Sequence, residues 1–421
     1  MRCERLSAAE DPAETAAALR SLIPAPESVR ESVSEIIASV RAGGDESLRH
    51  YTRRFDTGGT EPLQIPVDPG ELDATAAALE PDIRHAIERA IENLETVMVA
   101  SRAAPAQTVE LGSHRVVVRH APVTRAAIYV PSGRKPYPST AVMGVVPARM
   151  AGVEHIAVCS PPGKDGELDP VILGACRLTG ATAVYRMGGA HAIAALAYGT
   201  ETIKPVDVIV GPGNLYVQEA KRQVFGQVGI DGFAGPSDLL AIATGDADQE
   251  LLALDLLAQA EHGPGTLVLA VSDAPELLDA LERRIANEDD TGAVTCLVDA
   301  SDPDHALAVA EAFAPEHLQL VGSGAEALAD RVTKAGCLLV GAGAGTAFSD
   351  YIAGSNHILP TNGAARFASA LGPEHFVRRF SQVDITDPTE LAASAAPLAR
   401  AEGFVLHATS MEARIRDNEP R

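Results

Sequence analysis

The sequence predicts an α/β protein with two Rossmann-like domains whose dinucleotide fingerprint is incomplete, and with small helical segments at its N and C termini. Short β-rich runs alternate with helical runs from Val123 to about residue 345, a pattern typical of parallel sheets covered on both faces. With 421 residues the chain is too long for one simple core. The Gly-rich stretch "VGIDGFAGPSD" at 228–238 interrupts the pattern, so we expect two α/β units that meet there.

The expected elements follow in chain order. "SVSEIIASVRAGG" and "PDIRHAIERAIENLETVMVAS" repeat apolar residues at three- and four-residue spacing, which predicts helices. "QTVELGSHRVVVRHAPV" alternates around Gly112 and Ser113 and predicts a hairpin. The strand-like runs that follow are "RAAIYVP", "EHIAVCSPP", "ATAVYRMGG", "VDVIVGPG", "LLAIATG", "GTLVLAVSD", "AVTCLVDAS", "LQLVGSG" and "GCLLVGAG".

These elements suggest domain boundaries. We assign 1–24 to an N-terminal helical segment, 25–122 together with 236–370 to a first α/β domain, and 123–235 to a second α/β domain inserted into it. Residues 371–421 form a helical tail. The tail is amphipathic but detached from the strand pattern, so we expect it to pack elsewhere on the molecule or on a partner chain.

Composition argues against several classes of function. The net charge of −23, from 34 basic and 57 acidic residues, disfavours binding to phosphate backbones or anionic membranes. The five cysteines are scattered and include no C-x-x-C pair, which is typical of reduced thiols in the cytoplasm. We find no secretion signal and no run of about eighteen apolar residues, and therefore expect a cytoplasmic protein.

Two glycine-rich turns resemble a dinucleotide fingerprint without completing it. In "LLVGAGAGTA" Thr346 stands where the third glycine is needed, and in "VIVGPGNLYV" Tyr216 does. A tight strand-to-helix turn is the simpler interpretation of each. However, "GPGN" opening a helix would offer free backbone amides to a phosphate or a nicotinamide, so nucleotide binding stays open.

The tripeptide "PEH" occurs twice. Glu316 and His317 precede the strand-like run "LQLVG", whereas Glu374 and His375 precede the charged stretch "FVRRFS". A Glu-His pair at the edge of a sheet can act as paired general bases, and the alternative is charge decoration at a helix terminus. The first pair leaves both interpretations open, and the exposed setting of the second favours the structural one.

The helical run "ELLALDLLAQAEHGP" ends in an amide, a carboxylate and an imidazole. Asp246 or Asp248 can cap its start. Helical periodicity places Gln259 and His262 near one face and turns Glu261 away from them. A histidine at a helix C terminus is most often a favourable contact with the helix dipole, but the Gln-His pair is also half of a possible metal site.

The remaining ligands of such a site would come from distant segments. Asp350 and His357 flank the loop in "SDYIAGSNHILPT", and His407 lies in "AEGFVLHATS". Imidazole, carboxylate and amide oxygen together suit Zn²⁺, or Mn²⁺ or Co²⁺ in its place.

Several long segments, in this order and spacing, resemble the histidinol dehydrogenase family. They are "GPGNLYVQEAKRQVFGQVGIDGFAGPSDLLAIA", "DLLAQAEHGP", "FAPEHLQL", "SDYIAGSNHILPT" and "AEGFVLHA". The resemblance extends over nearly the whole chain, from "VRAGGDESLRHYTRRFD" to His407. It implies a zinc- and NAD⁺-dependent enzyme that oxidises L-histidinol through L-histidinal to L-histidine with two NAD⁺, the last steps of histidine biosynthesis.

The resemblance also implies a set of site residues. One Zn²⁺ per subunit would be held by Gln259, His262, Asp350 and His407, the last donated across a domain-swapped homodimer. Glu316 and His317 match the acid-base pair. The substrate would contact His317, the four metal ligands, and also Ser237, His357 and Glu402, and NAD⁺ would contact Tyr129, Asn214 and position 191.

Three positions in 123–235, which the resemblance implies is the cofactor domain, depart from the family pattern. His191 replaces a glutamine, Arg134-Lys135 stand where small or neutral residues are usual, and Gly144 stands where an asparagine is common. We therefore leave the choice between NAD⁺ and NADP⁺ open and expect an added phosphate near Arg134 to be tolerated. Two alternatives remain: a paralogue that oxidises another primary alcohol, such as a sulfonated diol, and a non-catalytic metal-binding or assembly protein.

Overall fold

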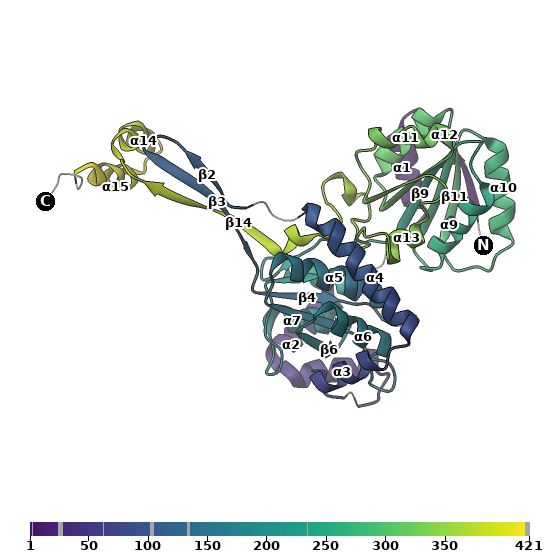
Figure 1. The fold of residues 1–421 in the computed structure, drawn as a ribbon, viewed down its shortest axis with the longest axis horizontal. Helices are drawn as coiled ribbons and strands as arrows, with labels where there is room; N and C mark the ends of the chain where they lie inside the picture. The colour runs from purple at the N-terminus through teal and green to yellow at the C-terminus, as the bar shows by residue number, and fades with distance from the viewer. Residues whose placement is uncertain are drawn as a thin grey trace. The chain divides into compact units, whose positions relative to one another are not determined.

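The computed structural model of the chain describes residues 1, 3–23, 28–61, 63–101, 105–132, 135–233 and 235–416. It confirms the predicted α/β class, with parallel sheets and many helices. The chain divides into two compact units, Met1–Ser101 with Val123–Phe376, and Arg102–Pro122 with Val377–Arg421. The first unit contains two parallel sheets (Figure 1).

The five-stranded sheet has the order β6-β5-β4-β7-β8, and all its neighbouring strands are parallel. Its strands are β4 (Arg125–Tyr129), β5 (His155–Ser160), β6 (Ala183–Arg186), β7 (Val208–Val210) and β8 (Gly229–Ile230). The chain builds outward from β4 in one direction and then restarts at β7 on the other side of β4. The strand order therefore reverses between β4 and β7.

Helices cover both faces of this sheet, and side chains alternate between them along β4. Ala126 and Ile128 pack into a core with the helices α4 and α5, whereas Ala127 and Tyr129 pack into a core with α2 and α7. The helices of this sheet are α2 (Arg30–Tyr51), α3 (Pro69–Ala77), α4 (Pro81–Met98), α5 (Pro138–Ala151), α6 (Pro170–Thr179), α7 (Gly189–Tyr198) and α8 (Leu215–Val224).

The boundaries expected for 25–122 differ from this arrangement. The helices in 30–98 pack against α5, α6 and α7 on the five-stranded sheet, and within 236–370 α4 contacts the segment around Ile352 and Ile358. An amphipathic helix has an apolar face, but its pattern does not specify which sheet buries that face.

The six-stranded sheet has the order β1-β11-β10-β9-β12-β13 and is also entirely parallel. Its strands are β1 (Cys3–Ser7), β9 (Asp238–Ala243), β10 (Leu267–Ser272), β11 (Val294–Asp299), β12 (His317–Val321) and β13 (Cys337–Val340). Its helices are α1 (Pro12–Ser21), α9 (Gln249–Ala260), α10 (Pro275–Ala286), α11 (Pro303–Phe313), α12 (Ser323–Glu326) and α13 (Thr346–Tyr351). The chain passes from the five-stranded sheet to the six-stranded sheet between β8 and β9.

The sequence suggested a separate helical segment over 1–24, and the structure differs. Cys3–Ser7 forms an edge strand parallel to β11, and α1 packs on α11. Leu6 packs against the core on one face of the sheet and Cys3 against the core on the other. The intervening charges suit an edge strand, since Arg5 pairs with Asp299 at 2.6 Å.

The second unit is a three-stranded antiparallel sheet followed by two helices. β2 (Gln107–Glu110) and β3 (His114–Pro122) form the predicted hairpin, closed by a hydrogen bond of 2.8 Å from Leu111 N to His114 O. β14 (Val377–Ile385) pairs with β3, and α14 (Thr389–Ala401) and α15 (Val405–Arg416) complete the unit.

The sequence suggested that the tail 371–421 is helical throughout, and the structure shows that it is not. "VRRFSQVDI" is β14, whose charged residues stand on a solvent-facing ribbon. Residues before it belong to the first unit, where Phe376 is buried in the core with α4 and α5.

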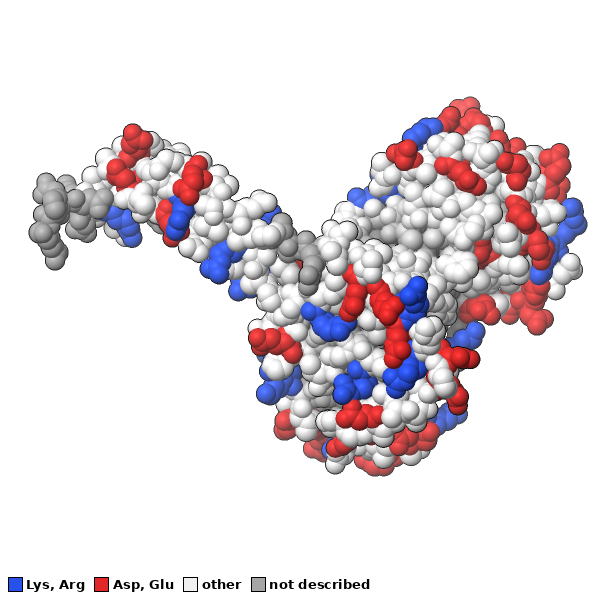
Figure 2. All heavy atoms as spheres, viewed as in Figure 1, with Lys and Arg blue, Asp and Glu red and all other residues white. Residues whose placement is uncertain are grey.

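Surface and thiol features complete the fold. Acidic side chains gather near α10, and basic side chains stand among them on the face drawn in Figure 2. All five cysteines are free, and three of them are buried. Among the residues with assigned structure, no helix combines the length and apolarity needed to cross a membrane.

Candidate functional site

The residues expected to carry the chemistry gather at the amino edge of the six-stranded sheet. Ser237 and Asp238 stand at the start of β9, and Glu316 and His317 stand at the start of β12. Because β9 and β12 are adjacent parallel strands, with His317 in register with Leu239, both starts reach the same edge. The strand pairing itself thus brings together residues that lie far apart in the sequence.

Glu316 is held by a reciprocal set of hydrogen bonds. Its Oε2 accepts from Ser237 Oγ at 2.6 Å and from Asp238 N at 2.9 Å. Its own backbone N–H donates to the carboxylate of Asp238 at 2.7 Å. Burial raises the pKa of Glu316, and neighbouring His317 and Ser237 offset part of that rise. Burial next to Glu316 also raises the pKa of Asp238, to about 7.

Gln259 reaches the same cluster from the end of α9. Asp248 caps the helix by accepting from Glu250 N and Leu251 N, and the left-handed φ of +85° at Gly263 follows its end. Gln259 Nε2 donates to Ser237 Oγ at 2.7 Å. The side chain is 1% exposed, and its Oε1 has no hydrogen-bond partner among the described residues.

The other two polar residues at this helix end point to different surroundings. His262 is exposed, and its Nδ1 lies 3.0 Å from Gln259 O. Glu261 instead lies 3.9 Å from Lys135 Nζ, and both of those side chains are well exposed. Glu261 is therefore outside the cluster, as its helical position predicted.

Asp350 connects the two histidines beside the cluster. It lies on α13 with Oδ1 3.4 Å from His317 Nε2, an ion-pair distance without hydrogen-bond geometry. Its backbone oxygen lies 2.8 Å from His357 Nδ1, and His357 Nε2 lies 3.2 Å from Thr140 Oγ1.

Burial and charge act on these groups in opposite directions. Burial alone would lower the pKa of His317, but Asp350 and Glu316 outweigh it and raise that pKa to about 9. Burial would raise the pKa of Asp350, but His317 and, to a smaller extent, His357 and His262 lower it. Burial lowers the pKa of His357, which favours its neutral form.

The donor set at this edge fits a divalent ion. The structure describes no cluster of three His, Cys, Asp or Glu side chains suited to a metal. A glutamine amide oxygen is not counted in such a cluster, yet Gln259 Oε1, like His317 Nε2, is buried and has no hydrogen-bond partner among the described residues. An unsatisfied buried oxygen is suited to a cation, because leaving it without a partner costs about 1–3 kcal/mol.

Two further expected site residues belong to the second unit. Glu402 is the C-cap of α14, and His407 is an exposed residue of α15 whose ring lies 5.2 Å from that of Phe404. Their positions are described within that unit alone.

The expected cofactor residues lie at the carboxyl edge of the five-stranded sheet. Tyr129 ends β4, and the turn from Gly211 to Asn214 follows β7. These are the two strands between which the order reverses, and the crevice at such a point is where open α/β sheets bind ligands. Asn214 caps α8, with its side-chain oxygen accepting from Tyr216 N at 3.0 Å and Val217 N at 3.1 Å.

His191 and Tyr129 are tied to the turn at the start of α7. Gly189 N donates to the Tyr129 hydroxyl at 3.1 Å. His191 is 1% exposed, and its Nε2 lies 3.1 Å from Asp56 Oδ2, which also accepts from Gly188 N at 3.0 Å. Asp56 was not expected here, and nothing in its sequence surroundings indicates this contact. Arg134 lies outside the described residues.

The second "PEH" tripeptide and the "LLVGAGAGTA" turn lie outside the cluster at the start of β9 and β12. Glu374 and His375 lie in a short 3₁₀ helix, where His375 Nδ1 is within 3.5 Å of Glu374 Oε1 and contacts Gly372. The "LLVGAGAGTA" turn follows β13, the edge strand of its sheet.

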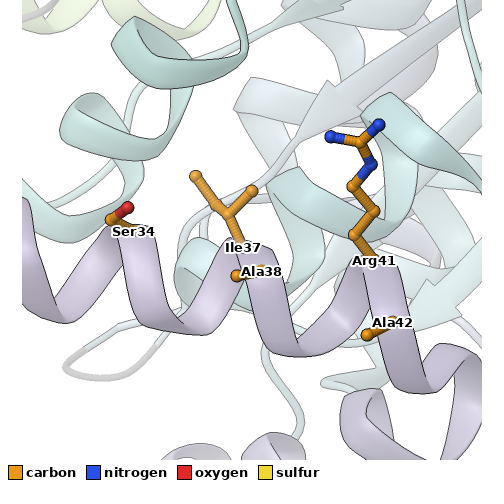
Figure 3. Close-up of a pocket in the computed structure, with 5 residues that line it drawn as sticks. All are labelled: Ser34, Ile37, Ala38, Arg41 and Ala42. Carbon is orange, nitrogen blue, oxygen red and sulfur yellow. The ribbon is translucent and has the colours of Figure 1, made fainter.

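Two surface hollows lie apart from these residues. One of about 470 Å³ is lined on α2 by Ser34, Ile37, Ala38, Arg41 and Ala42 (Figure 3). Another of about 480 Å³ is lined by Gly245, Ala247, Asp248, Gln249, Glu276 and Leu277. Both are open to solvent and lack the buried polar groups that fix a ligand.

Comparisons with known proteins identify the family of the chain. A family model described as histidinol dehydrogenase matches residues 24–415. The chain is 42% identical to histidinol dehydrogenase of Natronomonas pharaonis over 413 residues, covering 92% of this chain and 94% of the relative. It is 40% identical to that of Parasynechococcus marenigrum over 402 residues, covering 92% and 91%.

A solved structure has the same fold. The crystal structure of histidinol dehydrogenase from Elizabethkingia anophelis matches with a TM-score of 0.90 and 28% identity, covering 100% of this chain and 99% of that one. With a family model across most of its length and relatives near 40% identity, this chain belongs to the histidinol dehydrogenase family.

Proposed function

We propose that the protein oxidises L-histidinol through L-histidinal to L-histidine, with two NAD⁺ and one zinc ion per subunit, in the cytoplasm. As a member of its family it is an NAD-dependent oxidoreductase that acts on histidinol. The observation that carries the finer proposal is the cluster at the start of β9 and β12. It combines a buried carboxylate, a buried imidazole and a buried, unpartnered amide oxygen.

Zinc would be held by Gln259, His262 and Asp350, with His407 of the partner subunit as fourth ligand. These are amide, imidazole and carboxylate donors of the kinds that zinc accepts. A zinc ion held by these residues would supply a positive centre that positions the substrate. Ser237 orients Gln259 by accepting from Nε2, which directs Oε1 away from the serine.

His317 is the base for the alcohol. Its Nε2 is buried, has no hydrogen-bond partner among the described residues, and lies 3.4 Å from Asp350 Oδ1. A proton taken from the substrate hydroxyl is stabilised there, because the carboxylate favours the charged imidazolium. With the pKa of His317 at about 9, the neutral form that accepts this proton predominates above that pH. A bound NAD⁺ would supply the acceptor for the hydride from the same carbon.

Glu316 is the base for the water that attacks the aldehyde. Ser237 and Asp238 hold its Oε2, so Oε1 is the oxygen that can take a proton from water. Burial raises the pKa of Glu316, which makes its carboxylate a stronger base than an exposed one. The resulting hydrate gives up the second hydride without the aldehyde leaving the site.

The dinucleotide would bind at the carboxyl edge of β4 and β7, against Tyr129, His191 and Asn214. Because the Asn214 oxygen already caps α8, its contact with the cofactor would come from the Nδ2 donor. Tyr129 and His191 would act from a turn that their own hydrogen bonds fix.

A domain-swapped homodimer would complete the site. In the second unit Phe404, Val405 and Leu406 are consecutive and exposed, with Leu406 at 83%. Such a run next to the expected ligand His407 favours burial against a second copy. Glu402 and His407 of the partner subunit would then contact the substrate.

The first test is NADH absorbance with L-histidinol, with and without a chelator, in the wild type and in Glu316→Gln and His317→Asn. We expect NADH formation that the chelator and both substitutions abolish or strongly reduce. Glu374→Gln and His375→Asn, in the second "PEH" tripeptide, are matched controls that should retain activity. Turnover with another primary alcohol but not histidinol would select the paralogue, and no turnover with any alcohol would favour a non-catalytic metal-binding protein.

A further inference from the structure

Lys221 is a buried cation beneath the turn between β7 and α8. Its side chain is 1% exposed and stands inside the core face of α8. It forms an ion pair with Asp231, which directly follows β8 and is 11% exposed. Neither residue belongs to the catalytic or cofactor sets described above.

The pair holds both backbone groups of one residue. Lys221 Nζ donates to Gly211 O at 3.0 Å, and Gly211 N donates to Asp231 Oδ2 at 2.7 Å. Gly211 is the first residue after β7, so its N–H and C=O have left the regular ladder of the sheet. Two charged side chains bonded to each other therefore fix the point where the chain leaves the sheet.

Gly211 has little freedom to move. Its φ is +115°, which disfavours any other residue. A Cβ at this position would lie 2.3 Å from Tyr129 O. The turn thus packs directly on the backbone of the residue that ends β4.

α8 holds the rest of the turn that precedes it. Gln218 Nε2 donates to Gly213 O at 3.4 Å, and Asn214 caps the helix with its own side chain. Two side chains of α8, Lys221 and Gln218, therefore contact the turn, and Asp231 contacts it from the end of β8. The backbone of Gly211 to Asn214 is fixed at both ends before any ligand arrives.

We propose that Lys221 and Asp231 are positioning residues that set the β7–α8 turn in the conformation that binds the dinucleotide. The proposal rests on the proposed function, which places NAD⁺ at this edge. Stability alone is a poor explanation for the pair, because removing two charges from water often costs as much as their attraction returns. A geometric role explains why both charged side chains form hydrogen bonds with the two backbone groups of Gly211.

The test compares Lys221→Met, Asp231→Ala and Asp231→Asn with the wild type in the full-length protein. NADH binding is measured by fluorescence titration, and KM for NAD⁺ and for L-histidinol, kcat and zinc content are measured in parallel. We expect Lys221→Met and Asp231→Ala to raise the NADH Kd and the KM for NAD⁺ about tenfold, the loss expected for one hydrogen bond to a charged group. The KM for L-histidinol and the zinc content should stay unchanged.

Asp231→Asn separates geometry from charge. The asparagine oxygen can still accept from Gly211 N, so this milder variant should bind NADH more tightly than Asp231→Ala. It also keeps the test valid if Lys221→Met does not fold.

Arg186→Met is the matched control. Arg186 is 4% exposed on β6, the edge strand of the same sheet, and pairs with Glu71 and Glu167. Loss of Arg186 should lower the Tm about as much as Lys221→Met does, because both remove one partner of a buried ion pair. It should leave the NADH Kd unchanged.

Wild-type NADH affinity in Lys221→Met and Asp231→Ala would overturn the positioning role and leave the proposed function standing. Equal losses of affinity in Arg186→Met would also overturn it, because a general loss of stability would then suffice. A wild-type protein that binds no NADH or NAD⁺ would overturn both proposals together.

Discussion

Gln259 and Ser237 are joined by a hydrogen bond of 2.7 Å in which the glutamine amide donates to the serine hydroxyl. The hydroxyl in turn donates to Glu316 at 2.6 Å. One serine therefore determines the orientation of a side-chain amide on α9 and of a carboxylate at the start of β12. Since Nε2 faces the serine, Oε1 is the end of Gln259 directed elsewhere, and it has no partner among the described residues.

Ser237→Ala should weaken zinc binding although Ser237 is not among the expected ligands. Without the hydroxyl, the Gln259 amide loses the acceptor that orients it. Loss of a partner that orients a metal ligand typically lowers metal affinity about 10- to 100-fold. The measurement is zinc bound per subunit after dialysis against a series of chelator concentrations.

Gln223→Ala is the control for this prediction. Gln223 Nε2 donates to Arg30 O at 2.9 Å. Both residues lie on helices of the five-stranded sheet, so removing the Gln223 side chain should leave zinc affinity unchanged. Equal zinc retention in Ser237→Ala and the wild type would contradict the orienting role of the serine.

Glu316→Gln should separate the two oxidation steps. The glutamine keeps the shape of the side chain, and His317 remains to accept the proton of the alcohol. The base for water is lost, and a general base typically contributes about 10²- to 10⁴-fold. We expect turnover of supplied L-histidinal to fall by that range while single-turnover NADH formation from L-histidinol falls much less.

His317→Asn should show the opposite preference, with the alcohol step affected more than the aldehyde step. Rapid-mixing measurement of NADH with each substrate distinguishes the two. Equal losses in both steps for both variants would contradict the assignment of one base to each step.

Two inactive variants should restore activity to each other if the tail is exchanged. In a mixed dimer of Glu316→Gln and His407→Asn, one site carries both substitutions and the other carries neither. Random assortment of a two-fold dimer then recovers about one quarter of the wild-type activity. The measurement is NADH formation after the variants are mixed, unfolded and refolded together.

The control is a mixture of Glu316→Gln and His317→Asn. Both substitutions lie in the same unit of the chain, so every site in this mixed dimer carries one of them and no activity should return. If the mixture of Glu316→Gln and His407→Asn also fails to restore activity, His407 acts in its own subunit, and the prediction that the tail is exchanged between subunits is wrong.

Most strands could be predicted from the sequence because buried parallel strands are short, continuous apolar runs. β1 and β14 were missed for one shared physical reason. Both lie at the edge of their sheets, where charged residues such as Arg5 and Arg378 remain in solvent. The helices in 30–98 were recognised but assigned to the wrong sheet, because a helical pattern carries no information about its packing partner.

The site was predictable where helical periodicity determines geometry. The outward position of Glu261 follows from its helical spacing. Gln259 is buried and His262 is exposed, so the face that they were expected to share stays a prediction. The contacts of Asp238 with Glu316 and of Asp56 with His191 join residues far apart in the chain. They arise from strand register and helix packing, and one sequence contains no signal for either.

Gly144 illustrates a departure from the family pattern that the structure explains. It lies within α5, and a Cβ there would meet the Cγ2 and Cγ1 of Ile128 at 2.5 and 2.7 Å. Ile128 is fully buried on β4, so it occupies the space that a side chain at position 144 would need. Glycine at 144 and isoleucine at 128 are therefore complementary in this chain.

Gly144→Ala should lower the free energy of unfolding by about 1–3 kcal/mol through overpacking, although alanine is the better helix former by about 1 kcal/mol. Gly43→Ala in α2 is the matched control, because the closest atom there is the rotatable hydroxyl of Ser47. Urea unfolding of Gly144→Ala, Ile128→Ala and the double variant measures the coupling. We expect the double variant to be less destabilised than the sum of the single variants, because Ile128→Ala opens the space that the new methyl group fills. Additive effects would show that Ile128 does not determine which residue fits at position 144.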